Sequence, residues 1–316
     1  MNPLFSILIP VCNQEGKMDN CIKSIKAQTF SDFEVIMVDD GSKDGSYAEM
    51  KAIAAADERF QVVQHDGNKS LLAARYTGMT NANGQYILFV DSDDYIEADT
   101  LMSLKEFLDE KPVDIVRFGF RYEPKGKDWF QPESEDPLMD TMMGQIAPAI
   151  WKNCFAKRVI DKVIANSEPF YCNMGEDVCL CGLLYSCAES VEKIDRIFYH
   201  YEIGNGMSSQ RTNLSIEKLH RDMASIKASA AHLTAFVEKM NPAYLEGVKR
   251  AIRTMYRTVM VQNTLFEEDN VKIVRVMNEF DNEDFADIFD FGCKKLLPYI
   301  IKKQMGIMEN FSIVED

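Results

Sequence analysis

Three aspartates crowd the end of an apolar run in the stretch LFVDSDDYIEADTL. Asp91, Asp93 and Asp94 lie within four positions, and no Lys, Arg or His occurs between Arg75 and Lys105. Two carboxylates about 6 Å apart repel each other by roughly 3 kcal/mol at an effective dielectric constant near 20. A positive charge must therefore reach this strand end, either from a distant side chain or from a bound cation.

A second acidic pair, Asp39 and Asp40, follows another apolar run, FEVIMVDDGS. Oxygen ligands at positions i and i+2, such as Asp91 and Asp93, suit Mg²⁺ or Mn²⁺ held between a protein and a substrate diphosphate. Such a cation would neutralise both the acids and the phosphates. The sequence therefore predicts a Mg²⁺ or Mn²⁺ cofactor that arrives with a nucleotide.

Other interpretations of the acidic stretch are possible. An EF-hand loop fails because Ile96 stands where that loop requires glycine. An aspartate-nucleophile phosphatase also places D-x-D after an apolar strand, but it normally continues with Gly-Thr, whereas Asp94-Tyr95 follows here. Solvated acids that cap the next helix are a third interpretation. Because Asp99 can cap that helix, the earlier acids would remain unexplained.

The composition limits the class of protein. The chain has 316 residues and a formal net charge of -15, which argues against a nucleic-acid partner. Its eight cysteines show neither disulfide-framework nor zinc-ligand spacing, so a reducing compartment fits best. The N-terminus does not have the pattern of a signal peptide, and no apolar run is long enough to span a membrane. We therefore expect a cytoplasmic protein.

Strand-like and helix-like patterns alternate through the first 122 residues, which predicts a doubly wound, mostly parallel sheet flanked by helices. The predicted strands are 4–11, 33–42, 60–65, 85–90 and 113–122, and the predicted helices are 15–28, 46–58, 71–82 and 99–110. Ligands of such sheets bind beyond the carboxyl ends of the strands. The two acidic pairs should therefore meet at one edge of the sheet.

The pattern changes near residue 212, after which amphipathic helices predominate. We predict a catalytic α/β domain at 1–212, divided into a nucleotide-binding half at 1–112 and an acceptor half at 113–212, and a helical C-terminal region at 213–316. The segment KKLLPYIIKK, residues 294–303, is basic and apolar. It predicts either peripheral contact with an anionic membrane or, as we favour, a core helix interrupted by proline.

Two long blocks of the sequence resemble glycosyltransferase family 2, a family of inverting enzymes with the GT-A fold. The first is FSILIPVCNQEGKMDNCIKSIKAQTFSDFEVIMVDDGSKDGS, and the second is NKSLLAARYTGMTNANGQYILFVDSDDYIEADTL with its D-x-D motif. MGEDVCL resembles the catalytic Glu-Asp motif, and IFYHYEIGNGMSS is similar to a segment that often closes the catalytic domain. The resemblance covers roughly residues 4–210.

The resemblance implies a donor site. Asp40 matches the acid that binds the base, close to Pro10 and Val11 at the end of the first strand, and Ser92 lies within the D-x-D motif. Arg75 matches an arginine that could reach the donor phosphates or base. The alternative for Arg75 is an ion pair with an acid on its own sheet edge.

The resemblance also implies the reacting groups. Asp93 matches the direct metal ligand, and Asp91 lies nearer the ribose or a metal-bound water. His200 is a candidate third metal ligand, although a histidine between two tyrosines can equally pack or touch the acceptor. Asp177 matches the catalytic base, and the alternative for Glu176 and Asp177 is a helix N-terminus stabilised by acids.

Some positions depart from the family pattern or lie on its acceptor side. Cys12, Ser70 and Tyr76 replace residues that are commoner in the family, which affects the shape of the donor pocket. Trp151 and Lys152 fall where the family shapes the acceptor side, and Trp151 could equally belong to the core.

The expected function is metal-dependent, inverting transfer of a sugar from a nucleotide-diphosphate sugar to a hydroxyl of a glycan or lipid-linked acceptor. A UDP-sugar is favoured because a carboxylate at Asp40 can accept a hydrogen bond from the ring N–H of uracil, which cytosine lacks. The alternatives are a non-catalytic sugar-nucleotide or glycan-binding module and the aspartate-nucleophile phosphatase.

Overall fold

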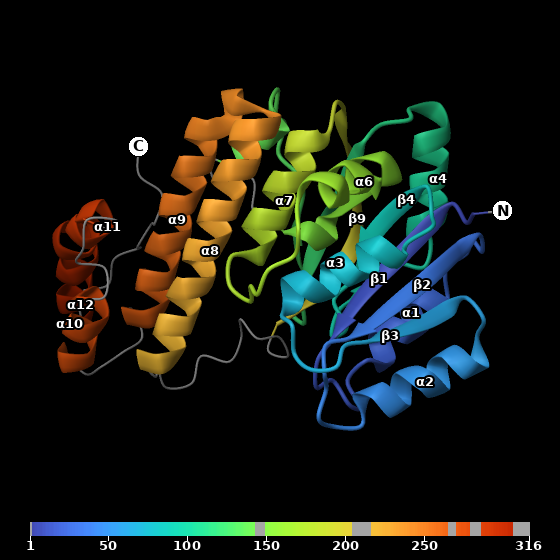
Figure 1. Ribbon diagram of the computed structural model, residues 1–316, viewed down its shortest axis with the longest axis horizontal. Helices are drawn as coiled ribbons and strands as arrows, with labels where there is room; N and C mark the ends of the chain where they lie inside the picture. Colours follow the sequence, from blue (N-terminus) through green and yellow to red (C-terminus); the bar gives the residue numbers. More distant parts are fainter. Residues whose placement is uncertain (1, 143–148, 204–215, 265–269, 279–285, 306–316) are drawn as a thin grey trace.

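The computed structural model of the chain describes residues 2–142, 149–203, 216–264, 270–278 and 286–305. A curved mixed sheet with helices on both faces forms one side of the molecule, and two long helices run alongside it (Figure 1). The sheet order is β3-β2-β1-β4-β8-β6-β9-β5, with β7 paired to β6. The strands are β1 (Phe5–Val11), β2 (Phe33–Asp39), β3 (Phe60–Gln64), β4 (Tyr86–Phe89), β5 (Tyr95–Ile96), β6 (Ile115–Glu123), β7 (Lys127–Trp129), β8 (Asn153–Ala156) and β9 (Val191–Glu202).

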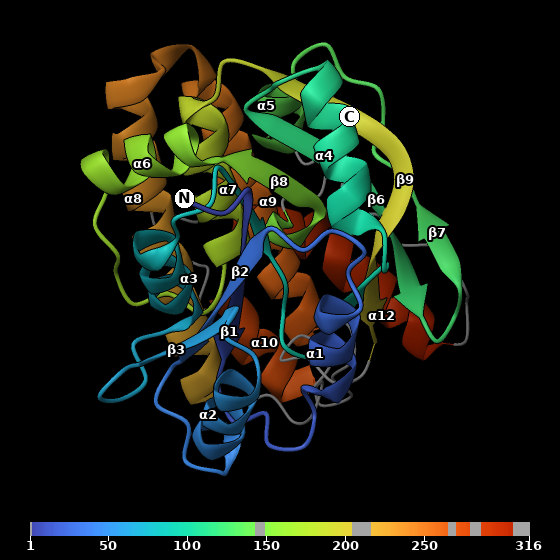
Figure 2. The ribbon, with the colours of Figure 1, turned by 90° about the vertical axis from the view of Figure 1, so that its right-hand side faces the viewer.

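The helices of the first 203 residues cover the sheet, and the later helices form a bundle beside it (Figures 1 and 2). The first group comprises α1 (Asp19–Lys26), α2 (Ser46–Ala56), α3 (Leu71–Asn81), α4 (Thr100–Glu110), α5 (Pro137–Met142), the short 3₁₀ helix η1 (Ile150–Lys152), α6 (Lys157–Asn166) and α7 (Glu176–Cys187). The second group comprises α8 (Ile216–Met240), η3 (Pro242–Tyr244), α9 (Leu245–Thr264), α10 (Asn270–Asn278), α11 (Ala286–Phe291), the π-helical turn η4 (Gly292–Leu296) and α12 (Leu297–Gln304).

The first half of the sheet has the predicted parallel arrangement. Strands β1 and β2 are apolar along almost their whole length because both faces of each strand are covered, and every residue of both is buried. In the parallel register Val11 lies opposite Asp39, and Leu8 lies opposite Phe89. The carboxyl ends of β1, β2 and β4 therefore meet, which brings the two acidic pairs to one edge. We call this edge the donor edge.

The second half of the sheet is mixed rather than a continuation of the parallel order. Strand β8 runs antiparallel to both β4 and β6, whereas β6 and β9 are parallel. The sequence did not indicate β8, which has only four residues, or the 12-residue strand β9. Strand β9 curves past the outer end of the sheet (Figure 2) and pairs with the short strand β5 directly after the acidic stretch.

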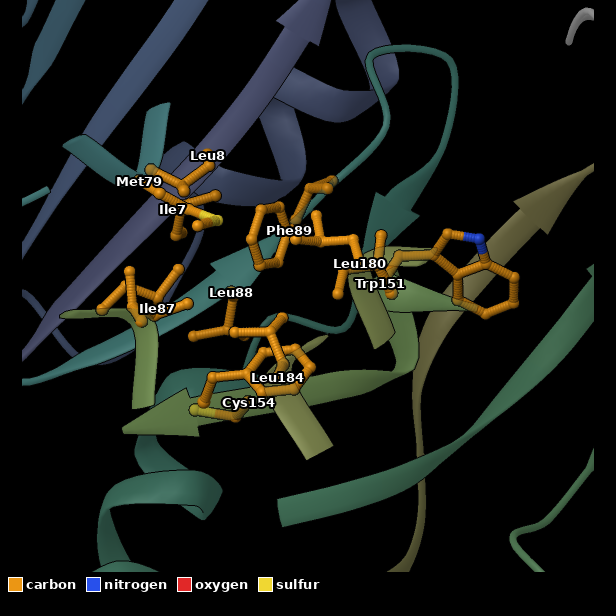
Figure 3. Packing of buried hydrophobic residues seen from close by; sticks show 14 of the residues in the cluster. Ile7, Leu8, Met79, Ile87, Leu88, Phe89, Trp151, Cys154, Leu180 and Leu184 are labelled. Atoms are coloured by element: carbon orange, nitrogen blue, oxygen red, sulfur yellow. The ribbon is translucent and has the colours of Figure 1, made fainter. Parts of the chain in front are cut away.

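The core lies between the sheet and α7, where side chains from separate segments interlock. Phe89 of β4 packs near Leu180 of α7 and Trp151 of η1, while Leu88 and Cys154 fill the adjoining space (Figure 3). The close packing accounts for the all-round apolar character of α7, whose residues from Cys179 to Cys187 are all buried. Helix α7 is thus held rigidly, and its first turn points toward the donor edge.

The helical region continues the same core. Leu233 and Val237 of α8 and Val248 of α9 belong to the main hydrophobic cluster, while a second cluster joins α9 to the last helices. Helix α8 packs directly along α7 (Figure 1). The predicted boundary at residue 212 lies outside the described residues.

The basic, apolar segment 294–303 forms the end of η4 and most of α12. Leu296 and Ile300 are buried in the second cluster, and Lys294 pairs with Asp290. This is the arrangement expected of the core-helix interpretation. Membrane contact by the same segment remains a prediction. None of the described helices is both long enough and apolar enough to cross a membrane.

The shared core predicts that the helical region and the sheet unfold together. Leu233→Ala should lower the free energy of unfolding by about 2–5 kcal/mol, because it removes buried methyl groups from the main cluster. Val274→Ala on α10 is the matched control: this side chain is 52% exposed, so its loss should cost less than about 0.5 kcal/mol. Urea unfolding should show one transition. Two separate transitions, or equal effects of the two variants, would contradict the shared core.

Candidate active site

Arg75 lies at the centre of the site. It projects from α3, and its side chain is 1% exposed. Nη2 donates to Oδ1 of Asp91 at 3.1 Å, and Nη1 donates to Oδ1 of Asp177 at 2.7 Å. Oε1 of Glu176 lies 3.7 Å from Nη1. One guanidinium therefore joins the acidic stretch after β4 to the Glu-Asp pair that begins α7.

These ion pairs supply a positive charge that the acidic stretch requires. Burial alone would lower the pKa of the Arg75 guanidinium, but Asp177, Asp91 and Glu176 together raise it above its ordinary value. Both sequence interpretations of Arg75 placed it at the donor edge. The structure gives it the ion pair with Asp91 and adds a second one with Asp177, which the sequence did not predict.

The other two acids of the stretch have no such cation among the described residues. Burial, with repulsion from Asp91, raises the pKa of Asp93 to about 6 and that of Asp94 to about 8. Asp94 accepts a hydrogen bond from the Tyr199 hydroxyl at 2.7 Å and another from the backbone N–H of Glu202 at 2.8 Å. Asp93 has no ion pair within the described part of the chain.

Asp94 uses its oxygens within the protein, so Asp93 is the acid of the stretch that is available to a cation. Asp91 retains a second carboxylate oxygen that Arg75 does not bind. No cluster of three or more His, Cys, Asp and Glu side chains among the described residues could enclose a metal ion. One or two carboxylates are nevertheless the usual protein share of a Mg²⁺ site whose other ligands are substrate phosphates and water. The residues present fit a metal held jointly with a diphosphate.

Tyr199 holds this acidic stretch in place. The side chain is fully buried, and its hydroxyl accepts from the backbone N–H of Asp91 at 3.1 Å while it donates to Asp94. The ring stacks on Trp151, with centroids 4.4 Å apart and an interplanar angle of 18°. Tyr199 thus links the donor edge to η1. In the sequence, Tyr199 stands out only as one of the two tyrosines that flank His200.

His200 does not join the acids that would hold the metal. Its Nε2 lies 2.8 Å from Oε1 of Glu97, its Nδ1 lies 3.1 Å from Oε1 of Glu123, and its ring stacks on Tyr95. With both ring nitrogens directed at glutamates, neither faces Asp91 or Asp93. These contacts are those that the packing interpretation of His200 predicts.

Glu176 and Asp177 occupy the first turn of α7, and Gly175 before them has the left-handed value φ = 82°. Both acids complement the positive end of the helix, as their alternative interpretation requires. Burial raises the pKa of the Asp177 carboxyl, while Arg75 opposes the increase. Burial and repulsion from Asp177 raise the pKa of Glu176. Asp177 is half-buried and remains partly open to solvent, as a proton acceptor must be.

The loop before α7 is positioned by α8. The Ser225 hydroxyl accepts from the backbone N–H groups of Asn173 and Met174 at 3.0 and 3.1 Å. Asn173 Oδ1 in turn accepts from the backbone N–H of Leu71 at 2.9 Å, at the start of α3. The helical region therefore fixes the relative positions of Arg75 and Asp177. No motif in the sequence pointed to Ser225.

Asp40 is buried, and its carboxylate is surrounded by donors. Oδ1 accepts from the backbone N–H of Lys69 at 2.7 Å and lies 2.7 Å from His65 Nδ1. Oδ2 accepts from the backbone N–H of Ser70 at 3.0 Å and from Asn68 Nδ2 at 2.9 Å. These four contacts match the four acceptor positions of a carboxylate. In this arrangement Asp40 anchors the loop 65–70.

The remaining donor-site candidates line the same edge. Pro10 and Val11 are buried at the end of β1, and Ser92 is buried within the acidic stretch. Cys12 begins the following loop, and its Sγ atom lies 3.5 Å from Nδ2 of Asn68. Asn68 is exposed, and we identify it as an addition to the predicted site that lies between β1 and the Asp40 loop.

The family model described as Glycosyl transferase family 2 matches residues 6–169, or 164 of 316 residues and so just over half of the chain. The chain belongs to glycosyl transferase family 2. The matched range of this family 2 chain includes Arg75, Asp91 and Asp93 and ends before Asp177.

Curated relatives of this family 2 chain are bacterial proteins. It is 42% identical over 120 residues to the uncharacterized glycosyltransferase EpsJ of Bacillus subtilis (strain 168), covering 38% of this chain and 35% of that protein. It is 28% identical over 222 residues to the glycosyltransferase GlyA of Streptococcus pneumoniae, covering 65% and 31%. It is 29% identical over 212 residues to the putative glycosyltransferase EpsH of Bacillus subtilis, and the aligned part covers 64% of this chain and 61% of EpsH. The chain thus spans between 31% and 61% of the length of these relatives.

Solved structures show the same fold. Residues 1–349 of S. aureus TarS superpose with a TM-score of 0.65 at 18% identity, covering 100% of this chain and 95% of that one. A mannosyltransferase, PcManGT from Pyrobaculum calidifontis, gives a TM-score of 0.54 at 14% identity, covering 97% and 84%. These similarities confirm the predicted GT-A fold with a helical C-terminal region.

The raised pKa of Asp94 predicts a pH dependence of stability. The folded state holds the Asp94 proton up to about pH 8, whereas the unfolded state loses it near its ordinary value. The contribution of Asp94 to the free energy of unfolding is therefore fully present at low pH and is lost as the pH rises toward 8. Asp94→Asn, which mimics the protonated acid, should gain on the wild type by about 1 kcal/mol or more between pH 5 and pH 8.

Urea unfolding in metal-free buffer at both pH values measures this difference. Asp195→Asn is the matched control, because Asp195 is an exposed acid paired with Lys193, and its effect should not change with pH by more than about 0.5 kcal/mol. Parallel pH profiles for the wild type and Asp94→Asn would show that Asp94 is already ionised in the folded protein.

Proposed function

We propose that the protein transfers a sugar, with inversion, from a nucleotide-diphosphate sugar to a hydroxyl of a glycan or lipid-linked acceptor. The observation that carries this proposal is the double ion pair of Arg75 with Asp91 and Asp177. It brings the donor edge and a half-buried carboxylate to opposite sides of one guanidinium. A donor at the edge would therefore present its anomeric carbon close to the carboxylate.

Asp177 would act as the base. The rise in its pKa through burial makes it a stronger proton acceptor than a solvated aspartate, and Arg75 keeps it ionised and oriented. It would take the proton of the acceptor hydroxyl as that oxygen attacks the anomeric carbon. Glu176 lies beside it, with Oε1 3.7 Å from Arg75 Nη1, and burial together with repulsion from Asp177 raises its pKa. A proton on Glu176 would leave Asp177 as the ionised acid of the pair.

Asp93 and the second oxygen of Asp91 would hold Mg²⁺ or Mn²⁺ together with the donor diphosphate. When bound, the cation would stabilise the negative charge of the departing nucleotide. The structure of PcManGT is described as a complex with GDP-Man and Mn²⁺, which supports the use of a divalent cation in this fold. The chain's own contribution is the fixed position of the acidic stretch, which Tyr199 holds through Asp91 and Asp94.

A UDP-sugar is our preferred donor. TarS has been solved in complex with UDP-GlcNAc and with UDP, which supports this choice. The four contacts of Asp40 change the reason for the preference: the carboxylate would act by fixing the backbone and side chain of loop 65–70. Asn68 in that loop has both a donor and an acceptor to offer to a base.

Two other functions are weaker candidates. A phosphatase would need Asp91 as a free nucleophile, but here its carboxylate is bound to Arg75. A binding module without turnover would need neither the base nor its alignment with the donor edge, yet Ser225 and Asn173 maintain that alignment. We also propose a cytoplasmic location, since the site would draw on a cytoplasmic nucleotide-sugar, and contact with a membrane surface where the acceptor is lipid-linked.

Two substitutions separate the roles of the acids. Asp177→Asn should retain Mn²⁺-dependent UDP binding and lose about 10²–10⁴-fold in the rate of transfer, because an amide cannot accept the proton. Asp93→Ala should abolish Mn²⁺-dependent UDP binding while leaving the fold intact, because it removes a repelled charge. Calorimetry with UDP and a panel of UDP-sugars assayed for transfer or donor hydrolysis measure both effects.

Asp195→Asn, distant in sequence and exposed, serves as the control and should keep both activities. Near-normal turnover in Asp177→Asn would remove this residue from the mechanism. Unchanged Mn²⁺-dependent UDP affinity in Asp93→Ala would remove the metal site. UDP binding by the wild type with neither transfer nor donor hydrolysis across the panel would favour the binding module.

UDP and CDP distinguish the preferred base. With Mn²⁺ present, UDP at a hundred times its dissociation constant should stabilise the fold by about 2.7 kcal/mol, and CDP at the same concentration should do much less. Asn68→Ala should reduce this difference without unfolding the protein, because Asn68 is exposed. Equal thermal shifts from UDP and CDP in the wild type would exclude recognition of uracil.

A further inference from the structure

Two buried cations on the acceptor side of the site have no acidic partner among the described residues. Lys152 in η1 is 2% exposed and Arg117 in β6 is 3% exposed. Lys152 Nζ and Arg117 Nε and Nη1 make no hydrogen bond to any part of the chain that the structure describes. Neither side chain takes part in an ion pair with a described acid. Most buried charges are paired, so this pair calls for an explanation.

The two charges act on each other and on the reacting groups. Burial lowers the pKa of the Lys152 ammonium to about 8, and the charge of Arg117 adds to this effect, while Asp177 opposes it. The β6–β8 register brings the two residues near each other, because Arg117 lies opposite Asn153, the residue after Lys152.

The position of η1 connects these cations to the proposed chemistry. The backbone of Ile150, at the start of η1, helps to lower the pKa of the Asp177 carboxyl, so η1 lies close to that group. Strand β8 follows η1 and runs antiparallel to β4, with Cys154 opposite Leu88, so η1 lies beside the start of the acidic stretch. Lys152 is thus held next to the base, but in the half of the domain that the donor edge does not occupy.

Aromatic side chains surround the pair. The ring of Trp129, on the short strand β7, lies 4.5 Å from Lys152 Nζ, and Trp129 is partly exposed. Trp151, the neighbour of Lys152, stacks on Tyr199 and Tyr201. Aromatic faces can bind sugar rings, and the contact with Trp129 compensates part of the buried ammonium charge. The charge that would compensate the rest is an anion.

We propose that Lys152 and Arg117 form an anion-binding subsite for the acceptor, and that the acceptor carries a phosphate or carboxylate group near the hydroxyl that receives the sugar. The inference rests on the proposed function and specifies its acceptor class. A guanidinium and an ammonium side by side match the oxygens of either anion. Trp129 is the group that the acceptor displaces or packs against. Binding of the anion would also hold the acceptor hydroxyl beside Asp177, because Asp177 lies close to η1, which carries Lys152.

The test replaces each cation by an apolar side chain of similar length. Lys152→Met and Arg117→Met should raise the KM for an anionic acceptor by about tenfold or more, because a charge-assisted hydrogen bond is lost. The acceptor probes are methyl glucoside, methyl glucuronide and glucose 6-phosphate, which present a neutral, a carboxylate and a phosphate form of one sugar. Wild-type transfer, or competition where a probe is not itself glycosylated, should favour one of the two anionic forms. The preferred form identifies the anion.

Matched controls separate the outcomes. Arg121→Met on the same strand removes a partly exposed arginine paired with Asp128 and should leave all constants unchanged. Both test variants should be at least as stable as the wild type to urea, because each removes an unpaired buried charge. Acceptor-independent hydrolysis of the UDP-sugar and Mn²⁺-dependent UDP binding should also stay as in the wild type.

Three results would overturn the subsite. The first is equal use of the neutral and anionic probes by the wild type. The second is an unchanged preference for the anionic probe in Lys152→Met and Arg117→Met. The third is weaker UDP binding in those variants, which would assign the cations to the donor site. If the wild type itself neither hydrolysed the UDP-sugar nor bound UDP, that result would instead count against the proposed function. Should one variant fail to fold, the Lys152→Arg exchange, which keeps the charge, must retain the preference for the anion.

Discussion

The structure depends on a single guanidinium placed between three carboxylates. Arg75 is almost completely removed from water, and it is ionised because Asp177, Asp91 and Glu176 surround it. A buried arginine that lost these partners would be an uncompensated charge, which is among the most destabilising defects in a folded protein. The acids, in turn, would repel one another without it. Strand β4, helix α3 and helix α7 are consequently fixed relative to one another by electrostatics as well as by apolar packing.

This arrangement also explains why the site contains acids in different states. Asp91 and Asp177 are paired with Arg75, which opposes the rise in the pKa of Asp177. Asp93 and Asp94 have raised pKa values because burial and their neighbours disfavour a further negative charge. Asp94 uses its oxygens to bind the Tyr199 hydroxyl and the backbone of Glu202. Four acids close in sequence or space thus perform separate tasks: Asp91 and Asp177 align the two sides, Asp94 braces the turn, and Asp93 remains open to a cation.

Much of the first half of the fold could be predicted from the sequence, because short-range patterns determine it. The apolar runs of β1 and β2 and the acids that follow them are typical of parallel strands, and their meeting at one edge followed from topology alone. The second half could not be predicted in the same way. Strand β8 has four residues, and its antiparallel pairing depends on contacts with β4 and β6 that leave no local pattern.

The site shows the same division between local and distant information. Motifs in the sequence point to Asp91, Asp93, Asp177 and Arg75 as candidate site residues. The ion pairs that join Arg75 to Asp91 and Asp177 link positions that are distant in sequence. Asp40 was expected to face the base, yet its oxygens are engaged by a loop more than 20 residues away. His200 was a reasonable ligand by residue type, but the strand pairing of β5 with β9 stacks it on Tyr95. Ser225 carries no motif, because its role depends only on where α8 lies.

The contact of Ser225 with the loop before α7 has a consequence for how chains of this family can be recombined. Sequence motifs invite an exchange of catalytic and helical parts at the point where the helices begin. In this protein the backbone N–H groups of the loop before α7 donate to a hydroxyl on α8. Such an exchange would combine this loop with an α8 from another protein that need not carry a hydroxyl at that position. A functional chimera should therefore take the segment 171–175 and α8 from the same protein. The part that must be exchanged together extends across the boundary that the motifs suggest.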